Sequence, residues 1–131
     1  MDTRETVAEF LQRRASGDID RIMEMVAEPA DFRSFGTPVA PWLGTFTGRT
    51  KAREFFTRLF AGTQAKGATV DAILVDGAEA VVLGDLAVTV VATGRTYKSP
   101  FVLRLTVRDG KIVRHHVFED SLALHQAMSG Q

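Results

Sequence analysis

The chain has 131 residues, of which 45% are hydrophobic and 24% charged, an ordinary balance for one soluble globular domain. Its 16 basic side chains equal its 16 acidic ones, so a nucleic-acid groove, which needs a basic excess, is not expected. The absence of cysteine excludes disulfides, thiolate metal sites and a cysteine nucleophile. The chain has no apolar signal core and no membrane-length apolar run, so we expect a cytoplasmic protein without membrane contact.

The first part of the chain predicts two helices. A helical spacing of apolar residues predicts the first over Glu5–Arg14, and Gly17 ends it. Asp18 is the expected N-cap of a second helix, which stops before Pro29. The apolar side chains expected to face inward are Val7, Phe10 and Leu11 from the first helix and Ile19, Ile22, Met23 and Val26 from the second.

A short strand and a long loop come next. The segment Ala30–Gly36 predicts the first strand, and a loop rich in proline and glycine follows it up to Gly48. This loop holds Trp42, the only tryptophan. Loops of about 12 residues inside a compact domain are often functional. Trp42 therefore either lines the mouth of a pocket or forms a lid over the core or a dimer contact.

One more long helix precedes a series of strands. Apolar residues from Ala52 to Phe60 recur at helical spacing and predict a helix over Thr50–Ala61, closed by Gly62, whose aromatic stripe faces the core. Gly84-Asp85 suggests a bulge or bend in one strand. The remaining predicted elements are strands over Thr69–Val75, Glu79–Ala92, Thr96–Arg108 and Lys111–Phe118, the last two joined by an Asp109-Gly110 turn, and a helix over Ser121–Met128.

Helices first and long sequential strands last predict an α+β fold, with one curved antiparallel sheet and the helices packed in its concave face. The strand Thr96–Arg108 is apolar on both sides of the pleat, and a sheet that is apolar on both faces must be covered on both. We therefore expect a homodimer that covers the outer sheet face. The two faces of that strand carry Phe101, Leu103, Leu105 and Val107 on one side and Pro100, Val102, Thr106 and Arg104 on the other.

Three motifs follow one another along the chain: Gly17-Asp18-Ile19-Asp20, Leu43-Gly44-Thr45-Phe46-Thr47-Gly48-Arg49, and Asp109-Gly110-Lys111-Ile112-Val113 leading to Phe118-Glu119-Asp120. In this order they resemble the nuclear-transport-factor-2-like superfamily, and within it the SnoaL-like group (polyketide cyclase, ketosteroid isomerase-like), over nearly the whole chain. The resemblance implies a single domain over residues 1–131: a cone-shaped α+β barrel with an internal pocket for a small hydrophobic ligand, commonly dimeric. Members of the superfamily include isomerases, cyclases, epoxide hydrolases, dehydratases and non-enzymatic modules, so the reaction must be argued from the site.

The catalytic groups of the known enzymes are missing at the matching positions. Ketosteroid isomerases use an aspartate base with a tyrosine and a protonated aspartate as oxyanion donors. The base position is taken by Ser34, the tyrosine position by Phe10 and the second aspartate position by Val102. The arginine and two aspartates of limonene epoxide hydrolases are replaced by Gly84, Leu86 and Val117. Neither activity is therefore expected.

The SnoaL-type cyclases place a histidine and an aspartate near the last strand. Here His115 resembles the family histidine, while the aspartate position is Val117. A period of two puts Val113, His115 and Glu119 on the face of Val117, with His115 and Glu119 about 13 Å apart by strand rise, too far for a direct hydrogen bond. His115 is thus the candidate general acid or base, since histidine titrates near neutral pH. The alternative is a hydrogen-bonded core or interface histidine.

Other polar residues complete the candidate site. Arg104 is a candidate to bind an anionic or carbonyl oxygen, unless it forms a structural ion pair, and Ser34, Trp42 and Glu119 are expected to line the pocket. Adjacent His115 and His116 point to opposite faces of a strand and cannot easily share an ion, so no metal or cofactor is expected. Two functions remain open: a small isomerase-, cyclase- or hydrolase-type enzyme acting on a hydrophobic carbonyl, polyketide or steroid-like compound, and a non-catalytic ligand-binding or dimerisation module.

Overall fold

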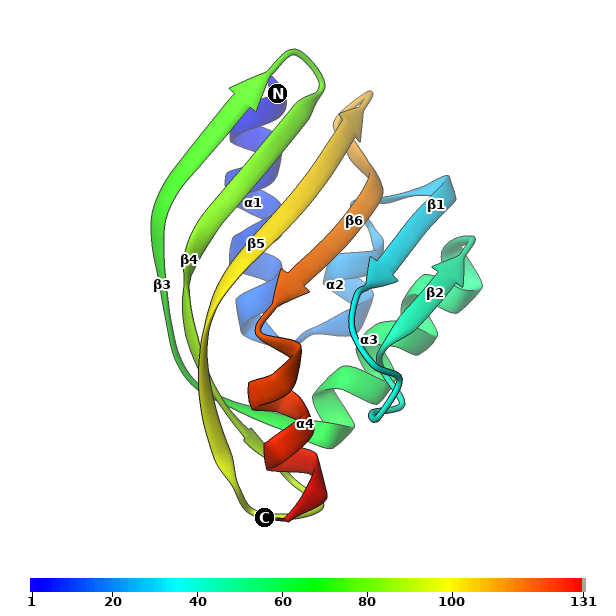
Figure 1. Cartoon of the computed structure of the whole chain (residues 1–131). Helices are drawn as coiled ribbons and strands as arrows, with labels where there is room; N and C mark the ends of the chain where they lie inside the picture. The colour runs from blue at the N-terminus through cyan, green and yellow to red at the C-terminus, as the bar shows by residue number, and fades with distance from the viewer. Residues whose placement is uncertain (131) are drawn as a thin grey trace.

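A computed structural model describes residues 1–130 and has the predicted α+β architecture, with one six-stranded sheet and helices packed against it (Figure 1). Gln131, the last residue of the predicted domain, lies outside the described residues. The helices are α1 (Thr3–Ser16), α2 (Ile19–Met23), α3 (Arg49–Gly62) and α4 (Ser121–Ser129), and the strands are β1 (Val26–Ser34), β2 (Gly44–Thr47), β3 (Thr63–Asp76), β4 (Glu79–Val90), β5 (Thr96–Arg108) and β6 (Lys111–Glu119).

The first two helices start at the caps that the sequence provides. The Asp2 carboxylate accepts a hydrogen bond from the backbone N–H of Glu5, whose own carboxylate accepts one from the N–H of Asp2. Asp18 caps α2 as predicted. The second helix is shorter than predicted, because Val26 already belongs to β1. The chain is drawn into the sheet there by a 2.7 Å hydrogen bond from the N–H of Ile112 to the carbonyl of Met25.

The sheet has the strand order β2-β1-β6-β5-β4-β3. It is mixed rather than wholly antiparallel, because β1 runs parallel to β6 while the other neighbouring pairs are antiparallel. The sheet is curved but does not close into the barrel that the family resemblance implied, so β2 and β3 remain as free edges (Figure 1). The prediction missed β2, which is short and lies in the loop rich in glycine. It also missed the first six residues of β3, which are mostly exposed and include no large apolar side chain.

A bulge or bend was predicted at Gly84-Asp85 of β4. The irregularity is found instead in β3, the strand that pairs with this part of β4. Pairing of β3 with β4 shifts register between Ala65 and Gly67 and again between Val70 and Ala72. Gly84 is needed because β3 approaches closely: a Cβ added there would lie 2.0 Å from the Thr69 carbonyl oxygen. A glycine thus marks the bend, but the extra residues belong to the partner strand.

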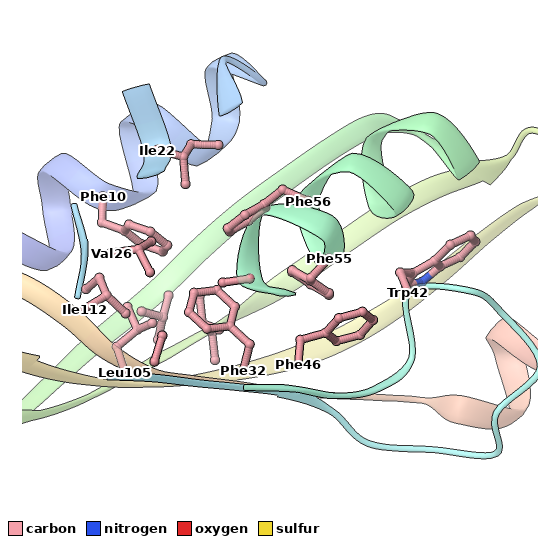
Figure 2. Packing of buried hydrophobic residues seen from close by; sticks show 14 of the residues in the cluster. Phe10, Ile22, Val26, Phe32, Trp42, Phe46, Phe55, Phe56, Leu105 and Ile112 are labelled. Carbon is pink, nitrogen blue, oxygen red and sulfur yellow. The ribbon is translucent and has the colours of Figure 1, made fainter. Parts of the chain in front are cut away.

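One face of the sheet packs against α1, α2 and α3 to form the core. Figure 2 shows Phe32 of β1 lying between the sheet and Phe56 of α3, with Trp42 at the far end of the cluster. Trp42 is only 5% exposed and packs against Gly62, where an added Cβ would lie 2.3 Å from the indole. The tryptophan therefore lies as a lid over the core, closing the end of α3.

A bulge in β6 decides which side chains face this core. Thr106 pairs with Arg114 and Val107 pairs with Ile112, so Val113 has no partner on β5. Both Ile112 and His115 are consequently fully buried, which strict alternation along β6 does not allow. The predicted period of two from Val113 to His115 is interrupted at this point.

The last helix follows β6 and lies along the first half of β5 (Figure 1). Asp120 caps α4, accepting hydrogen bonds from the N–H groups of Leu122 and Ala123. Two further bonds fix the helix against β5 and its turn: the Asp120 N–H donates to Ser99 Oγ, and Thr93 Oγ1 donates to the Ala127 carbonyl. Within residues 1–130, no helix has the length and apolar character needed to cross a membrane.

Candidate functional site

His115 lies at the centre of an aromatic cluster on the inner face of the sheet. It is paired in register with Phe32 of β1 on one side and Leu105 of β5 on the other, and its side chain is fully buried. The Phe32 ring stacks on the imidazole with the centroids 4.5 Å apart and the planes 6° from parallel. The rings of Phe10, Phe55 and Phe56 meet it edge-on or nearly so, with centroids at 5.6 to 5.8 Å.

The imidazole has one polar contact, with an arginine of the first helix. Arg14 Nε donates a 3.2 Å hydrogen bond to His115 Nε2. An Nε2 that accepts requires the proton of the neutral ring to be on Nδ1, which is buried without a hydrogen-bond partner among the described residues. Burial first, and the positive charge of Arg14 second, hold the pKa of His115 well below its usual value. His115 is therefore a neutral hydrogen-bond acceptor.

A second polar pair joins β5 and β6. The Tyr97 hydroxyl donates a 2.6 Å hydrogen bond to Glu119 Oε1. Burial raises the pKa of Glu119, and the hydrogen bond from Tyr97 and the charge of Arg14 oppose that rise. Burial and the neighbouring carboxylate also raise the pKa of Tyr97. Glu119 as a residue is partly exposed, and its carboxyl group is desolvated although the side chain is not fully buried.

Arg14 links the two pairs. Its guanidinium lies 5.9 Å from the centroid of the Phe56 ring and donates to His115, while the negative charge of Glu119 favours its protonated form. Burial is the larger effect and lowers the pKa of Arg14 from 12.5 to about 10. We call Arg14, Tyr97, His115 and Glu119 the interior polar cluster. It combines a cation, a hydroxyl, a neutral imidazole and a carboxyl group beside an apolar wall.

The structure brings only some of the predicted site residues together. His115 and Glu119 lie on the inner face, and Ser34, which pairs in register with Val117, is buried on that face too. Trp42 lies farther along the core, against Gly62.

The prediction that Arg104 shares this site is corrected by the register of β5. Arg104 alternates with the buried Leu103 and Leu105 and so points to the outer face, where it is paired with His116 of β6. There its Nε lies 3.1 Å from Glu79 Oε1, and Thr106 donates to the same carboxylate. The structural ion pair is therefore the role that the structure gives Arg104.

Arg14 and Tyr97 were missed by the sequence reasoning. Arg14 follows Phe10 by four residues, which places the two on the same helix face. Tyr97 has the same parity as the apolar positions 101, 103 and 105 of its strand, which places it on their face of the sheet. Both signals are present in the sequence, but each residue lies near the end of an element, where a polar or aromatic side chain is ordinary.

Metal binding finds no support in the geometry. His116 lies on the outer face, with Nε2 3.3 Å from Asp31 Oδ2, away from His115. No group of three or more histidine, aspartate or glutamate side chains within the described part of the chain is arranged to hold a metal ion.

The arrangement of the elements defines the class of protein: an open, curved sheet with three helices on one face and polar groups between them, the nuclear-transport-factor-2-like fold. A family model for the SnoaL-like domain matches residues 7–115, and the chain belongs to that family. No match is found among curated protein sequences.

Solved structures agree on the fold. A nuclear-transport-factor-2-like protein from Burkholderia xenovorans is 22% identical, with 96% of this chain and 95% of that chain covered and a TM-score of 0.83. A Bacillus subtilis protein with a provisional isomerase assignment is 19% identical, with 100% and 98% covered and a TM-score of 0.85. A Mesorhizobium loti protein, provisionally assigned as a SnoaL-like polyketide cyclase, is 21% identical, with 90% and 99% covered and a TM-score of 0.73. At these identities the likeness concerns the fold alone.

Proposed function

We propose that the chain is a small enzyme of the isomerase or cyclase type, which moves a proton on a hydrophobic carbonyl compound held beside the interior polar cluster. One observation carries this proposal: the 2.6 Å hydrogen bond between the Tyr97 hydroxyl and a partly exposed Glu119 carboxyl group whose pKa is raised by burial. A carboxylate with a raised pKa is a stronger base and is better matched to proton transfer near neutral pH.

Glu119 suits this role better than His115, the residue favoured by the sequence. The imidazole is fully buried among phenylalanine rings, its Nε2 is occupied by Arg14, and its pKa is lowered. A ligand would have to displace Arg14 to reach it. Glu119 Oε2 carries no hydrogen bond from the described residues, so this oxygen is the one that would exchange a proton.

The reaction assigned to Glu119 is an enolisation that returns its proton. Glu119 Oε2 takes a proton from the carbon next to the carbonyl group, the C–H electron pair moves into the enolate, and the same carboxyl group returns the proton to that or a conjugated carbon. Tyr97 holds the other carboxyl oxygen and stabilises its anion. No net proton, electron or co-reactant is needed.

Hydrogen–deuterium exchange tests this step. The α-protons of 2-tetralone, a hydrophobic ketone, should exchange with D₂O faster in the presence of the protein than in buffer, as measured by proton NMR. Glu119→Gln should lower the protein-dependent rate by about 100-fold or more, the usual contribution of a general base. The matched control is Glu79→Gln, which removes a carboxylate from the outer face and should leave the rate unchanged.

An equal rate with and without the protein, or an equal rate for the wild type and Glu119→Gln, would contradict the proposal. The chain would then be better described by the alternative, a module that binds a small hydrophobic ligand without catalysis.

We also propose that a second copy of the chain covers the outer sheet face. Phe35 and Phe118 stack there with centroids 4.6 Å apart, yet remain 42% and 41% exposed. The same face carries charges of both signs, in the ion pairs Arg33–Asp31 and Arg104–Glu79. A face that mixes both signs can pair with itself across a two-fold axis, and the zero net charge of the chain offers little repulsion.

A further inference from the structure

The hydrogen-bonding capacity of Arg14 is only partly used. Its Nε donates to His115, and neither of its two terminal NH₂ groups bonds to any of the described residues. Arg14 is partly exposed although its neighbours Phe10 and His115 are fully buried. Four N–H donors of a guanidinium therefore remain open to a ligand at the edge of the apolar core.

The hydrogen bond to His115 fixes the direction of the Arg14 guanidinium. His115, which accepts the Nε bond, is held by a stacked Phe32 and by edge contacts from Phe10, Phe55 and Phe56, so the imidazole cannot turn without disturbing the core. The Phe56 ring also lies near the guanidinium itself. An arginine that is oriented in this way loses little conformational freedom on binding a ligand.

We propose that the terminal NH₂ groups of Arg14 bind a carboxylate of the ligand, that His115 is the positioning residue that aims them, and that the substrate is therefore a hydrophobic keto acid. The planar fork of a guanidinium matches the two oxygens of a carboxylate and binds them in a bidentate manner. This inference rests on the proposed function only for the keto group; the carboxylate assignment concerns Arg14 and His115 alone.

The charges of the cluster are consistent with an anionic ligand. Arg14 carries the one positive charge of the cluster and already lowers the pKa of Glu119 from a distance. A ligand carboxylate on Arg14 would weaken that effect and favour protonated Glu119. Binding of the acid therefore prepares Glu119 to hold the proton that it exchanges, and the neutral variant Glu119→Gln should bind the acid at least as tightly as the wild type.

The test compares two probes of the same shape, 2-naphthoate and 2-naphthamide, by NMR titration of ¹⁵N-labelled protein. In the wild type, naphthoate should bind about 10-fold or more tightly than naphthamide, the order expected for a charge-assisted pair. Naphthoate should also shift the Arg14 Nε–Hε signal, which is assigned by its loss in Arg14→Lys.

Variants separate the two roles. Arg14→Gln should abolish the preference for naphthoate, and Arg14→Lys, which keeps the charge but not the fork, should retain part of it. His115→Phe removes the acceptor and should lower the preference several-fold, whereas His115→Gln supplies a neutral acceptor and should restore most of it. The preference is a ratio measured within each variant, so a general loss of folding cannot imitate the result, and naphthamide binding reports that each variant is folded.

Three results would overturn the inference: equal binding of the two probes to the wild type, no binding of naphthoate at millimolar concentration, or a naphthoate preference that survives Arg14→Gln. The proposed function fails separately. If Glu119→Gln and the wild type exchange tetralone protons equally while naphthoate preference follows Arg14, only the proton-transfer proposal is wrong; if exchange depends on Glu119 but naphthoate is not preferred, only the carboxylate assignment is wrong.

Discussion

Arg14 in the first helix and His115 in the last strand meet through a single hydrogen bond, 3.2 Å from Nε to Nε2, across 101 positions of sequence. The bond joins the helical layer to the sheet at the point where four phenylalanine rings converge. A change at either end should therefore affect both the packing of α1 on the sheet and the direction of the guanidinium, and the two effects are distinguishable by measurement.

The stability of the protein should fall as the pH is lowered below about 6.5. Burial holds the pKa of His115 well below 6.5 in the folded state, so the unfolded chain binds that proton more readily. The stabilisation that neutral His115 contributes is complete above the pKa of this histidine in the unfolded chain. It is lost as the pH falls toward and through the pKa of His115 in the folded state, with a slope of about 1.4 kcal/mol per pH unit for one proton. Urea unfolding at pH 7.5, 6.5 and 5.5 (about one pH unit apart) measures this loss.

His115→Gln provides the comparison for that experiment. Glutamine has no proton to gain in this range, so the variant should lose about 1.4 kcal/mol less per pH unit than the wild type over the same interval. Glu119, whose raised pKa acts in the opposite direction, is present in both proteins and cancels in the difference. Equal slopes for the two proteins would show that His115 is protonated as easily in the folded state as in the unfolded one.

Tyr97→Phe should raise the pKa of Glu119 further. The hydrogen bond from the Tyr97 hydroxyl stabilises the carboxylate form, and phenylalanine removes it while keeping the ring. The measurement is the pH dependence of the Glu119 side-chain ¹³C carboxyl signal, assigned by its loss in Glu119→Gln. An unchanged or lower pKa in Tyr97→Phe would mean that the hydroxyl does not favour the charged form.

Gly62→Ala should destabilise the protein by about 1–3 kcal/mol, the usual cost of overpacking a core. The added methyl group would lie 2.3 Å from the Trp42 ring, which must move. Gly67→Ala is the matched control, because a Cβ there meets nothing within 4 Å. In a Trp42→Ala background, the penalty of Gly62→Ala should largely disappear, and a penalty that persists would indicate a backbone cause instead.

Arg104→Gln should leave naphthoate binding unchanged and alter the free energy of unfolding by less than about 1 kcal/mol. The guanidinium is paired with Glu79 on the outer face, and both side chains are about two-fifths exposed, so solvent screens the pair. A loss of naphthoate binding in this variant would place Arg104 back in the ligand site and contradict the register of β5.

Phe118→Glu should convert the proposed dimer into a monomer, as measured by size-exclusion chromatography with light scattering. The substitution places a charge within the exposed Phe35–Phe118 pair on the outer face. Leu122→Glu, at an exposed position on α4, controls for the added charge and should remain dimeric. A wild-type mass equal to that of one chain would contradict the dimer.

The fold was predictable because its helices and strands carry strong local signals. Asp18, the aromatic stripe of α3, the Asp109-Gly110 turn and the Asp120 cap each act over a few residues, and the structure confirms the elements that they mark. The parallel pairing of β1 with β6 was not predictable in this way, because register between distant strands leaves no local pattern.

The candidate site was predicted less completely, for a related reason. His115 and Glu119 were found from their place on the last strand, whereas Arg14 and Tyr97 join them only through contacts between distant segments. Arg104 was placed wrongly because one residue of register decides which face a side chain occupies. On β5 it is Leu103 and Leu105, not Arg104, that pair with the inward-facing Val117 and His115.

The two register shifts of β3 have a consequence for the behaviour of the protein at high concentration. This long strand is an unpaired sheet edge and exposes Val70 and Leu74, which would invite other chains to add to it and form polymers. The shifts leave Lys66 and Asp71 bulged and exposed, so the free backbone groups do not form one continuous row. Interrupted in two places, each marked by a charge, the edge is a poor template for aggregation.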